Sequence, residues 1–128
     1  MIWKERYEKI LKTENEIKEI YDNKCEIENN IIKDIDVITV GHFGNCVSID
    51  MLCDNVCPFP LWNSTHNIGY IIRALIDIFD KEHDSGAKLS VLKGTPIRIV
   101  YQERKAVAIG HFMKDRFVLI EDLMQLDN

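Results

Sequence analysis

Long uninterrupted apolar runs are absent from this chain of 128 residues. Charged residues interrupt every apolar stretch well before the roughly 20 residues that a membrane-spanning helix needs, so we expect no membrane span and no membrane partner. The first six residues, Met1–Arg6, contain no apolar secretory segment. Together these absences predict a protein of the cytoplasm.

Positive charge is also in short supply. The chain has 16 lysines and arginines against 21 aspartates and glutamates, which gives a net charge of −5 and a pI near 5.3. Binding DNA or RNA through the backbone needs a basic footprint, so the composition argues against a nucleic acid polymer as partner. Four of the five arginines lie in residues 67–128, where a small anionic ligand could be bound.

Motifs that carry catalysis are missing as well. The sequence has no nucleophile elbow, no His-Glu-x-x-His pair and no phosphate-binding loop. Cysteines and four histidines are available to form a nucleophilic site in space, but no pattern indicates one. We therefore expect a protein without catalytic residues and without a cofactor.

The four cysteines are expected to be free thiols. Without a secretory segment, Cys25, Cys46, Cys53 and Cys57 are predicted to be reduced. His42, Cys46, Cys53 and Cys57 are residue types that bind zinc, but they lack the closely spaced C-x2-C pair of structural zinc sites. Buried free cysteine is common, so we predict no metal site.

The patterning predicts one α+β domain over residues 1–128. Apolar residues at three- and four-residue spacing predict a long N-terminal helix over 1–30, a possible oligomerisation element. The remaining core, 35–126, is predicted to contain a β-hairpin (35–40 and 46–52), a central helix (68–79) and a C-terminal antiparallel β-meander (96–102, 105–112 and 116–120). Residues 53–63 are predicted to be irregular because two prolines restrict the backbone.

Three kinds of residue suggest a site for a nucleotide. Two aromatic residues before the central helix could stack on a base. Three polar residues at the helix entry could donate hydrogen bonds to ribose or phosphate, and two arginines on later strands could neutralise phosphate. Each also has an ordinary explanation, because polar residues cap helices and aromatic residues cover cores. The candidate ligand-binding residues are Phe59, Trp62, Thr65, His66, Asn67, Arg98 and Arg116.

Three segments of the second half carry a family resemblance. They are Asn67–Asp77 (NIGYIIRALID), Leu92–Val100 (LKGTPIRIV) and Val107–Phe117 (VAIGHFMKDRF). These segments resemble small phage and prophage proteins and are similar to the Thoeris anti-defence sponge proteins, which sequester a cyclic ADP-ribose signal made by bacterial TIR enzymes. The resemblance implies a homo-oligomer in the host bacterial cytoplasm that binds a small cyclic nucleotide signal without degrading it.

Two other functions compete with signal capture. The first is a protein-interaction inhibitor of a host defence complex, in which the acidic residues 1–36 face a basic partner. The second is a small enzyme that acts on nucleotides. We expect the binding functions to be favoured over the enzyme, because no residue pattern supports bond cleavage.

Overall fold

The computed structural model describes residues 2–40, 44–54, 59–81 and 88–127. These residues form helices packed on one six-stranded antiparallel sheet with the order β3-β2-β1-β4-β5-β6. The predicted α+β class is confirmed, as is the order of helix, hairpin, central helix and meander. The elements are α1 (Ile2–Ile10), α2 (Glu14–Ile20), β1 (Glu26–Val40), β2 (Cys46–Cys53), β3 (Phe59–Ser64), α3 (Ile68–Ile78), the 3-10 helix η1 (Leu89–Leu92), β4 (Pro96–Gln102), β5 (Lys105–His111), β6 (Phe117–Leu119) and α4 (Ile120–Met124).

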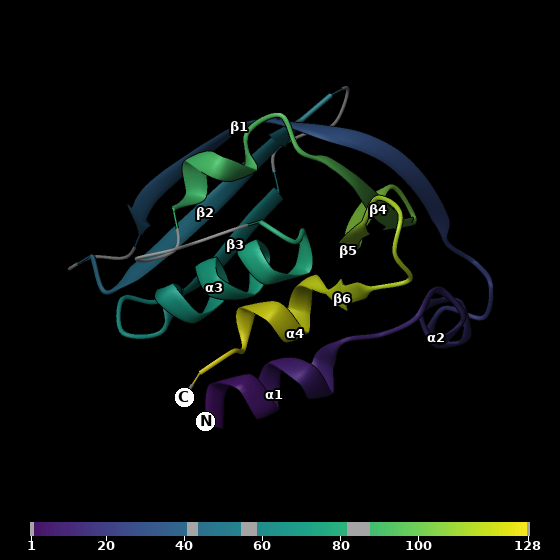
Figure 1. Cartoon of the computed structure of the whole chain (residues 1–128), viewed down its shortest axis with the longest axis horizontal. Coiled ribbons are helices and arrows are strands. Elements are labelled where there is room, and N and C mark those ends of the chain that lie inside the picture. The colour runs from purple at the N-terminus through teal and green to yellow at the C-terminus, as the bar shows by residue number, and fades with distance from the viewer. Residues whose placement is uncertain (1, 41–43, 55–58, 82–87, 128) are drawn as a thin grey trace.

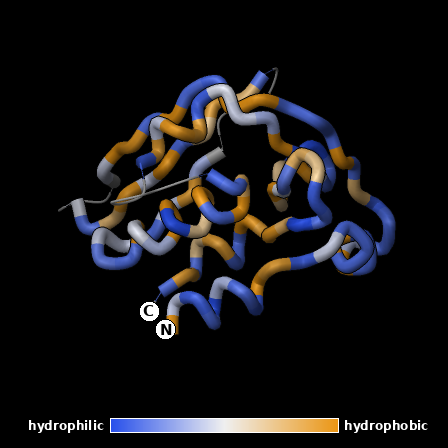
Figure 2. Tube along the Cα trace, in the orientation of Figure 1, coloured by the Kyte–Doolittle hydropathy of each residue, from blue (hydrophilic) through white to orange (hydrophobic). Residues whose placement is uncertain are grey.

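The sheet is curved and arches over α3 and α4, with α1 beneath them and α2 beside the end at which β1 begins (Figure 1). Helix α3 is rich in isoleucine, and Ile71, Leu75 and Ile78 are fully buried in the core with Ile49 and Met51 of β2. Figure 2 shows the hydrophobic segments of the sheet and of α3 and α4 around this interior. Burying one such side chain contributes about 1.5–3 kcal/mol, so this inner face provides much of the stability.

A second, smaller cluster lies on the opposite, outer face of the sheet. Ile17 of α2 is fully buried there with Val100, Ala108 and Phe117 of strands β4 to β6. Helix α2 therefore covers the outer face only at the β4–β6 end.

The predicted helix over 1–30 is divided in the structure, and its last residues belong to a strand. Lys12 forms two backbone hydrogen bonds of 2.8 Å with Phe117, which interrupts the helix between α1 and α2. Thr13 then begins α2 with a capping box: its Oγ1 accepts from the Glu16 N–H, and its own N–H donates to Glu16 Oε1. The prediction of one continuous helix is thus corrected by a pairing across 105 residues of sequence.

Strand β1 is longer than predicted. Its first half pairs with β4 and its second half with β2, with a register shift between Ile32 and Asp34. The predicted strand, 35–40, is only the part that pairs with β2. Glu26 and Glu28 are exposed although they lie on the same face as the buried Ile32, so this half lacks the alternation of apolar and polar residues that predicts a strand.

The predicted irregular segment 53–63 ends in a regular strand. Residues 59–64 form β3, which lies at the edge of the sheet and pairs with β2. Proline cannot donate a hydrogen bond to a neighbouring strand, so it is confined to edges and bulges. Pro60 lies in such an edge strand, which explains why it is tolerated and corrects the prediction.

The capping box at Thr13 offers a test of the α2 assignment. Replacing Thr13 with alanine removes the acceptor for the Glu16 N–H and is expected to lower the free energy of unfolding by about 0.5–1 kcal/mol. Urea unfolding followed by circular dichroism measures the change. Asn15→Ala, at an exposed position in the same helix, is the control and should be neutral or slightly stabilising. Equal losses in both variants would contradict the capping role.

Candidate binding surface

The aromatic and helix-entry residues of the predicted site form one continuous segment. Phe59 begins β3, where it pairs with Met51. Trp62 is 50% exposed on the same strand. Thr65 and His66 are exposed and Asn67 is half-buried in the turn that leads into α3. The side chains of Trp62, Thr65 and His66 are therefore accessible to solvent.

Arg98, on β4, is engaged within the fold. Its guanidinium donates to the carbonyls of His111 and Lys114 at 2.8 and 2.7 Å and contacts Glu14 at 3.4 Å. It also lies 4.7 Å from the centroid of the Phe117 ring. Arg98 therefore stabilises the turn between β5 and β6. Its N–H donors are hydrogen-bonded to protein groups and do not point to a ligand site.

Arg116 closes the C-terminal end of α3. The Lys81 N–H donates to the Ile76 carbonyl and the Asp80 N–H to the Asp77 carbonyl, which is the Schellman arrangement. Arg116 donates to the carbonyls of Asp77 and Ile78 and to Asp80 Oδ1. The arginine thus gives the Asp77 carbonyl a further donor and supplies a donor to the Ile78 carbonyl at the helix end.

The seven predicted site residues therefore fall into two separate groups. Arg98 and Arg116 each contact groups near the turn between β5 and β6 or the C-terminal end of α3, whereas Thr65, His66 and Asn67 lie at the N-terminal end of α3. Eleven helical residues span about 16 Å at 1.5 Å per residue. One small nucleotide within a single chain would not bridge the two groups.

A charged cluster that sequence reasoning missed surrounds Asp80. Its carboxylate accepts hydrogen bonds from Lys114 and Arg116, and His111 Nε2 lies 3.2 Å from Asp80 Oδ2. Hydrogen bonds from Lys114 and then Arg116 lower the pKa of Asp80 from 3.8 to about 2. The only signal in the sequence was the Lys-Asp-Arg run at 114–116, and its partner is 34 residues away.

His111 is held as a neutral ring in this cluster. Its Nδ1 accepts from the backbone N–H groups of Met113 and Lys114, both at 3.0 Å. Burial lowers the pKa of His111, although the Asp80 carboxylate opposes that shift. Among the described residues, no serine, threonine or cysteine side chain is hydrogen-bonded to His111.

The cysteines within the described ranges are free. Cys25 and Cys46 are partly buried and Cys53 is buried. Burial, and to a lesser extent Asp54, raises the pKa of Cys53 to about 11, which makes this thiol unreactive at neutral pH. Residues 2–40, 44–54, 59–81 and 88–127 contain no group of three or more metal-ligating side chains. His42 and Cys57 lie outside them.

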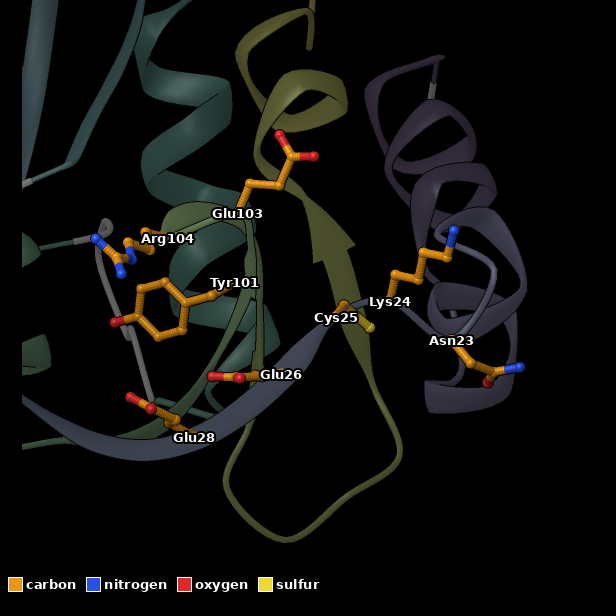
Figure 3. Close-up of a pocket in the computed structure, with 8 residues that line it drawn as sticks. All are labelled: Asn23, Lys24, Cys25, Glu26, Glu28, Tyr101, Glu103 and Arg104. Atoms are coloured by element: carbon orange, nitrogen blue, oxygen red, sulfur yellow. The ribbon is translucent and has the colours of Figure 1, made fainter.

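An open hollow of about 600 Å³ lies where β1 begins (Figure 3). Glu28, Tyr101 and Arg104 gather on one side of it, while Asn23 and Lys24 lie on the other side, toward α2. Burial, and next the charge of Glu28, raises the pKa of Tyr101. The hollow mixes three carboxylates with two cations and therefore has no strong preference for either charge. Its lining residues are Asn23, Lys24, Cys25, Glu26, Glu28, Tyr101, Glu103 and Arg104.

The outer face of β1, β2 and β3 carries large apolar side chains that are open to solvent. Successive residues of a strand point to opposite faces. Ile49 and Leu61 point inward and are fully buried, whereas the outward residues Ile38, Leu52 and Trp62 are 46%, 39% and 50% exposed. We call the set Asp34, Asp36, Ile38, Ser48, Asp50, Leu52, Pro60 and Trp62 the outer patch.

Two rows of residues across the three strands organise the outer patch. In one row Ser48 lies between Ile38 and Trp62, and it is only 4% exposed despite pointing outward. In the next row Asp36 and Asp50 are cross-strand neighbours. The Ser48 hydroxyl donates to Asp50 Oδ1 at 2.6 Å, which orients that carboxylate. The outer patch therefore combines an apolar ridge with adjacent negative charge, and β2 and β3 contain no lysine or arginine.

The edge of β3 is less suited to binding than this face. Pro60 has no N–H to offer, and the Ser64 N–H is already used by the side chain of Asn63 at 2.8 Å. Such features blunt an edge against the addition of another strand. Binding through side chains on the face is therefore favoured over strand pairing at the edge.

The described residues contain no helix with both the length and the apolar character needed to cross a bilayer. No family model matches the chain, and neither a curated protein nor a solved structure matches it at a significant level, so the resemblance to the sponge family stays a hypothesis.

Proposed function

We propose that the protein acts by binding, without catalysis, and that its outer patch docks on a basic surface of a protein partner, which it thereby blocks. The observation that carries the proposal is the half-exposed pair Trp62 and Ile38 beside Asp36 and Asp50. Exposed aromatic residues with polar surroundings are typical interface anchors. Carboxylates beside them select a partner of opposite charge and speed its association.

A second copy of this chain is a poor occupant of the outer patch. A symmetric dimer places the same surface of both copies in contact. Asp34, Asp36 and Asp50 of one copy would then face a patch whose only charged residues are the same three aspartates, so no cation of the patch could pair with them. The proposal keeps the acidic recognition of a basic partner that the sequence suggested, and moves it from the N-terminal helices to the strands.

Capture of a cyclic ADP-ribose-type signal by a homo-oligomer is our second proposal. The observation in its favour is that Trp62, Thr65 and His66 are exposed within one short segment. Stacking on one aromatic ring contributes about 1–3 kcal/mol, whereas nanomolar capture requires about −12 kcal/mol. Since Arg98 and Arg116 are bound to protein groups, the remaining affinity would have to come from a second subunit.

The first proposal is tested with a phage-displayed library of random 16-residue peptides selected on the immobilised protein. We expect enriched peptides to place lysine or arginine beside an aromatic or aliphatic residue. Their affinity should fall at least tenfold for Trp62→Ala and should weaken as salt rises. Because Trp62 is half-exposed and lies in an edge strand, the variant should remain folded, which thermal unfolding checks before affinities are compared.

Met113→Ala is the matched control, since Met113 is 82% exposed but lies outside the outer patch. Its peptide affinities should equal those of the parent protein. Enriched peptides without basic residues, or peptides insensitive to Trp62→Ala, would refute docking at this face.

The second proposal needs a separate readout. The protein is incubated with cyclic nucleotides that include ADP-ribose isomers, separated, heat-denatured and examined by mass spectrometry. Intact ligand in the released fraction supports signal capture, and chemically altered ligand would instead identify an enzyme. A protein that depletes none of the panel is not a sponge for these signals.

A further inference from the structure

We infer that the basic partner segment runs along β1 and inserts a second apolar side chain into a hollow at the other end of the strand. This inference rests on the proposed docking at the outer patch. The inference adds the form of the partner segment, which is a basic stretch with one apolar anchor residue at each end.

The hollow is built around Ile31, where β1 passes from β4 to β2. It has a volume of about 530 Å³, and its apolar walls are Ile31, Pro96 and Phe112. Ile31 is 45% and Phe112 is 40% exposed, so both can still bury surface on binding. The full lining is Glu28, Asn29, Asn30, Ile31, Asp54, Pro96 and Phe112.

The side chains of Ile31 and Ile38 point to the same face of the sheet, the outer one. Ile32 is fully buried in the inner core, so its neighbour Ile31 points outward. The register shift between Ile32 and Asp34 inserts one extra residue, after which the even-numbered positions point outward. The hollow and the Ile38–Trp62 ridge are therefore two apolar sites on one continuous face.

The distance between these sites sets the length of the occupant. Ile38 follows Ile31 by seven positions, which corresponds to about 23 Å at 3.3 Å per residue. An extended partner segment covers the same distance with about seven residues. Its anchors would therefore be spaced by about seven positions.

Charge between the two apolar sites sets the chemistry of the segment. Asp34 and Asp36 point outward on β1, and Asp50 lies beside Asp36 on β2. Lys33 is the nearby cation of β1, and its ammonium is paired with Asp54. The three outward carboxylates thus remain to be matched by lysine or arginine in the middle of the partner segment.

The test uses fluorescein-labelled synthetic peptides with alternating lysine and glycine between a tryptophan and a leucine. The two anchors are set four, seven or ten positions apart, and a one-anchor peptide ends in glycine in place of leucine. Fluorescence anisotropy gives Kd for the parent protein, Trp62→Ala and Phe112→Ala. We expect the tightest binding at a spacing of seven, at least fivefold tighter than for the one-anchor peptide.

Phe112→Ala should abolish that fivefold gain while leaving the one-anchor peptide unchanged. Equal Kd at all spacings, or a gain that survives Phe112→Ala, would overturn the two-anchor arrangement. If the one-anchor peptide still loses affinity on Trp62→Ala, docking at the outer patch stands and only this inference fails. If no peptide binding depends on Trp62, both proposals fail.

Discussion

Replacing Gly110 with alanine is expected to destabilise the protein by about 3 kcal/mol. Gly110 pairs with Phe117 across β5 and β6, and a Cβ at this position would lie 2.6 Å from Cε1 and 2.8 Å from Cγ of the Phe117 ring. The ring is fully buried and lies against the guanidinium of Arg98, so it has little room to move away. The cost is the strain of displacing a packed aromatic side chain.

Urea unfolding at pH 7 measures this effect, and Gly69→Ala is the matched control. Nothing lies within 4 Å of a Cβ at Gly69, which is in the first turn of α3. Alanine restricts the unfolded chain there and should stabilise the protein by about 0.4–1 kcal/mol. If Gly110→Ala is too unstable to purify, the double variant with Phe117→Leu should recover folding. If Gly110→Ala has the same free energy of unfolding as the wild-type protein, the Phe117 ring is free to move and the prediction is wrong.

The second large effect is expected for Asp80→Asn, which should lower stability at pH 7 by about 1.5 kcal/mol. Asparagine keeps the shape and also tolerates the left-handed backbone at this residue, where φ is 53°. The change therefore isolates the charge that Lys114 and Arg116 contact. A lowering of the pKa from 3.8 to about 2 corresponds to about 2.5 kcal/mol at a shielded site. The estimate is reduced because 37% of the side chain is open to solvent.

The pH dependence of that difference follows from the lowered pKa of Asp80. The unfolded chain takes up the proton near pH 3.9, whereas the folded protein takes it up only near pH 2. The stabilisation is therefore complete above about pH 5 and is lost as the pH falls toward 2. Urea unfolding from pH 2 to 7 should show the two proteins converging at low pH. A constant difference across that range would contradict the electrostatic origin.

Local sequence patterns were enough to predict the helices and strands whose conformation is determined by neighbouring residues in the chain. The isoleucine spacing in 68–79 predicted α3, and the turns at Glu103–Arg104 and Lys114–Asp115 separated the strands of the meander. The division of the N-terminal helix was not predictable in this way. It depends on Lys12 pairing with Phe117, and no local signal reports a partner so far along the chain.

The candidate site was only partly predictable for a similar reason. The sequence predicts Trp62 as a site residue, and it is exposed, but Ile38 and Asp50 of the outer patch have the pattern of ordinary strand residues. Whether Ile38 and Asp50 are exposed depends on which face of the sheet the helices cover, and that is a property of the tertiary structure. The arginines illustrate the opposite case: Arg98 and Arg116 looked available in the sequence, and the fold supplies carbonyl and carboxylate partners for both.

The division of β1 between two partners has a consequence for synthesis. Its second half pairs with β2, which follows directly in the chain, whereas residues 26–31 pair with 96–102. During translation the hairpin can form early, but the first half of the strand must wait until about 70 further residues have left the ribosome. Long-range pairings of this kind fold slowly and leave strand edges open to aggregation in the interval. The nascent chain therefore passes through a stage in which the first half of β1, up to Ile31, has no partner strand. Conditions that slow the emergence of β4 should lower the yield of folded protein.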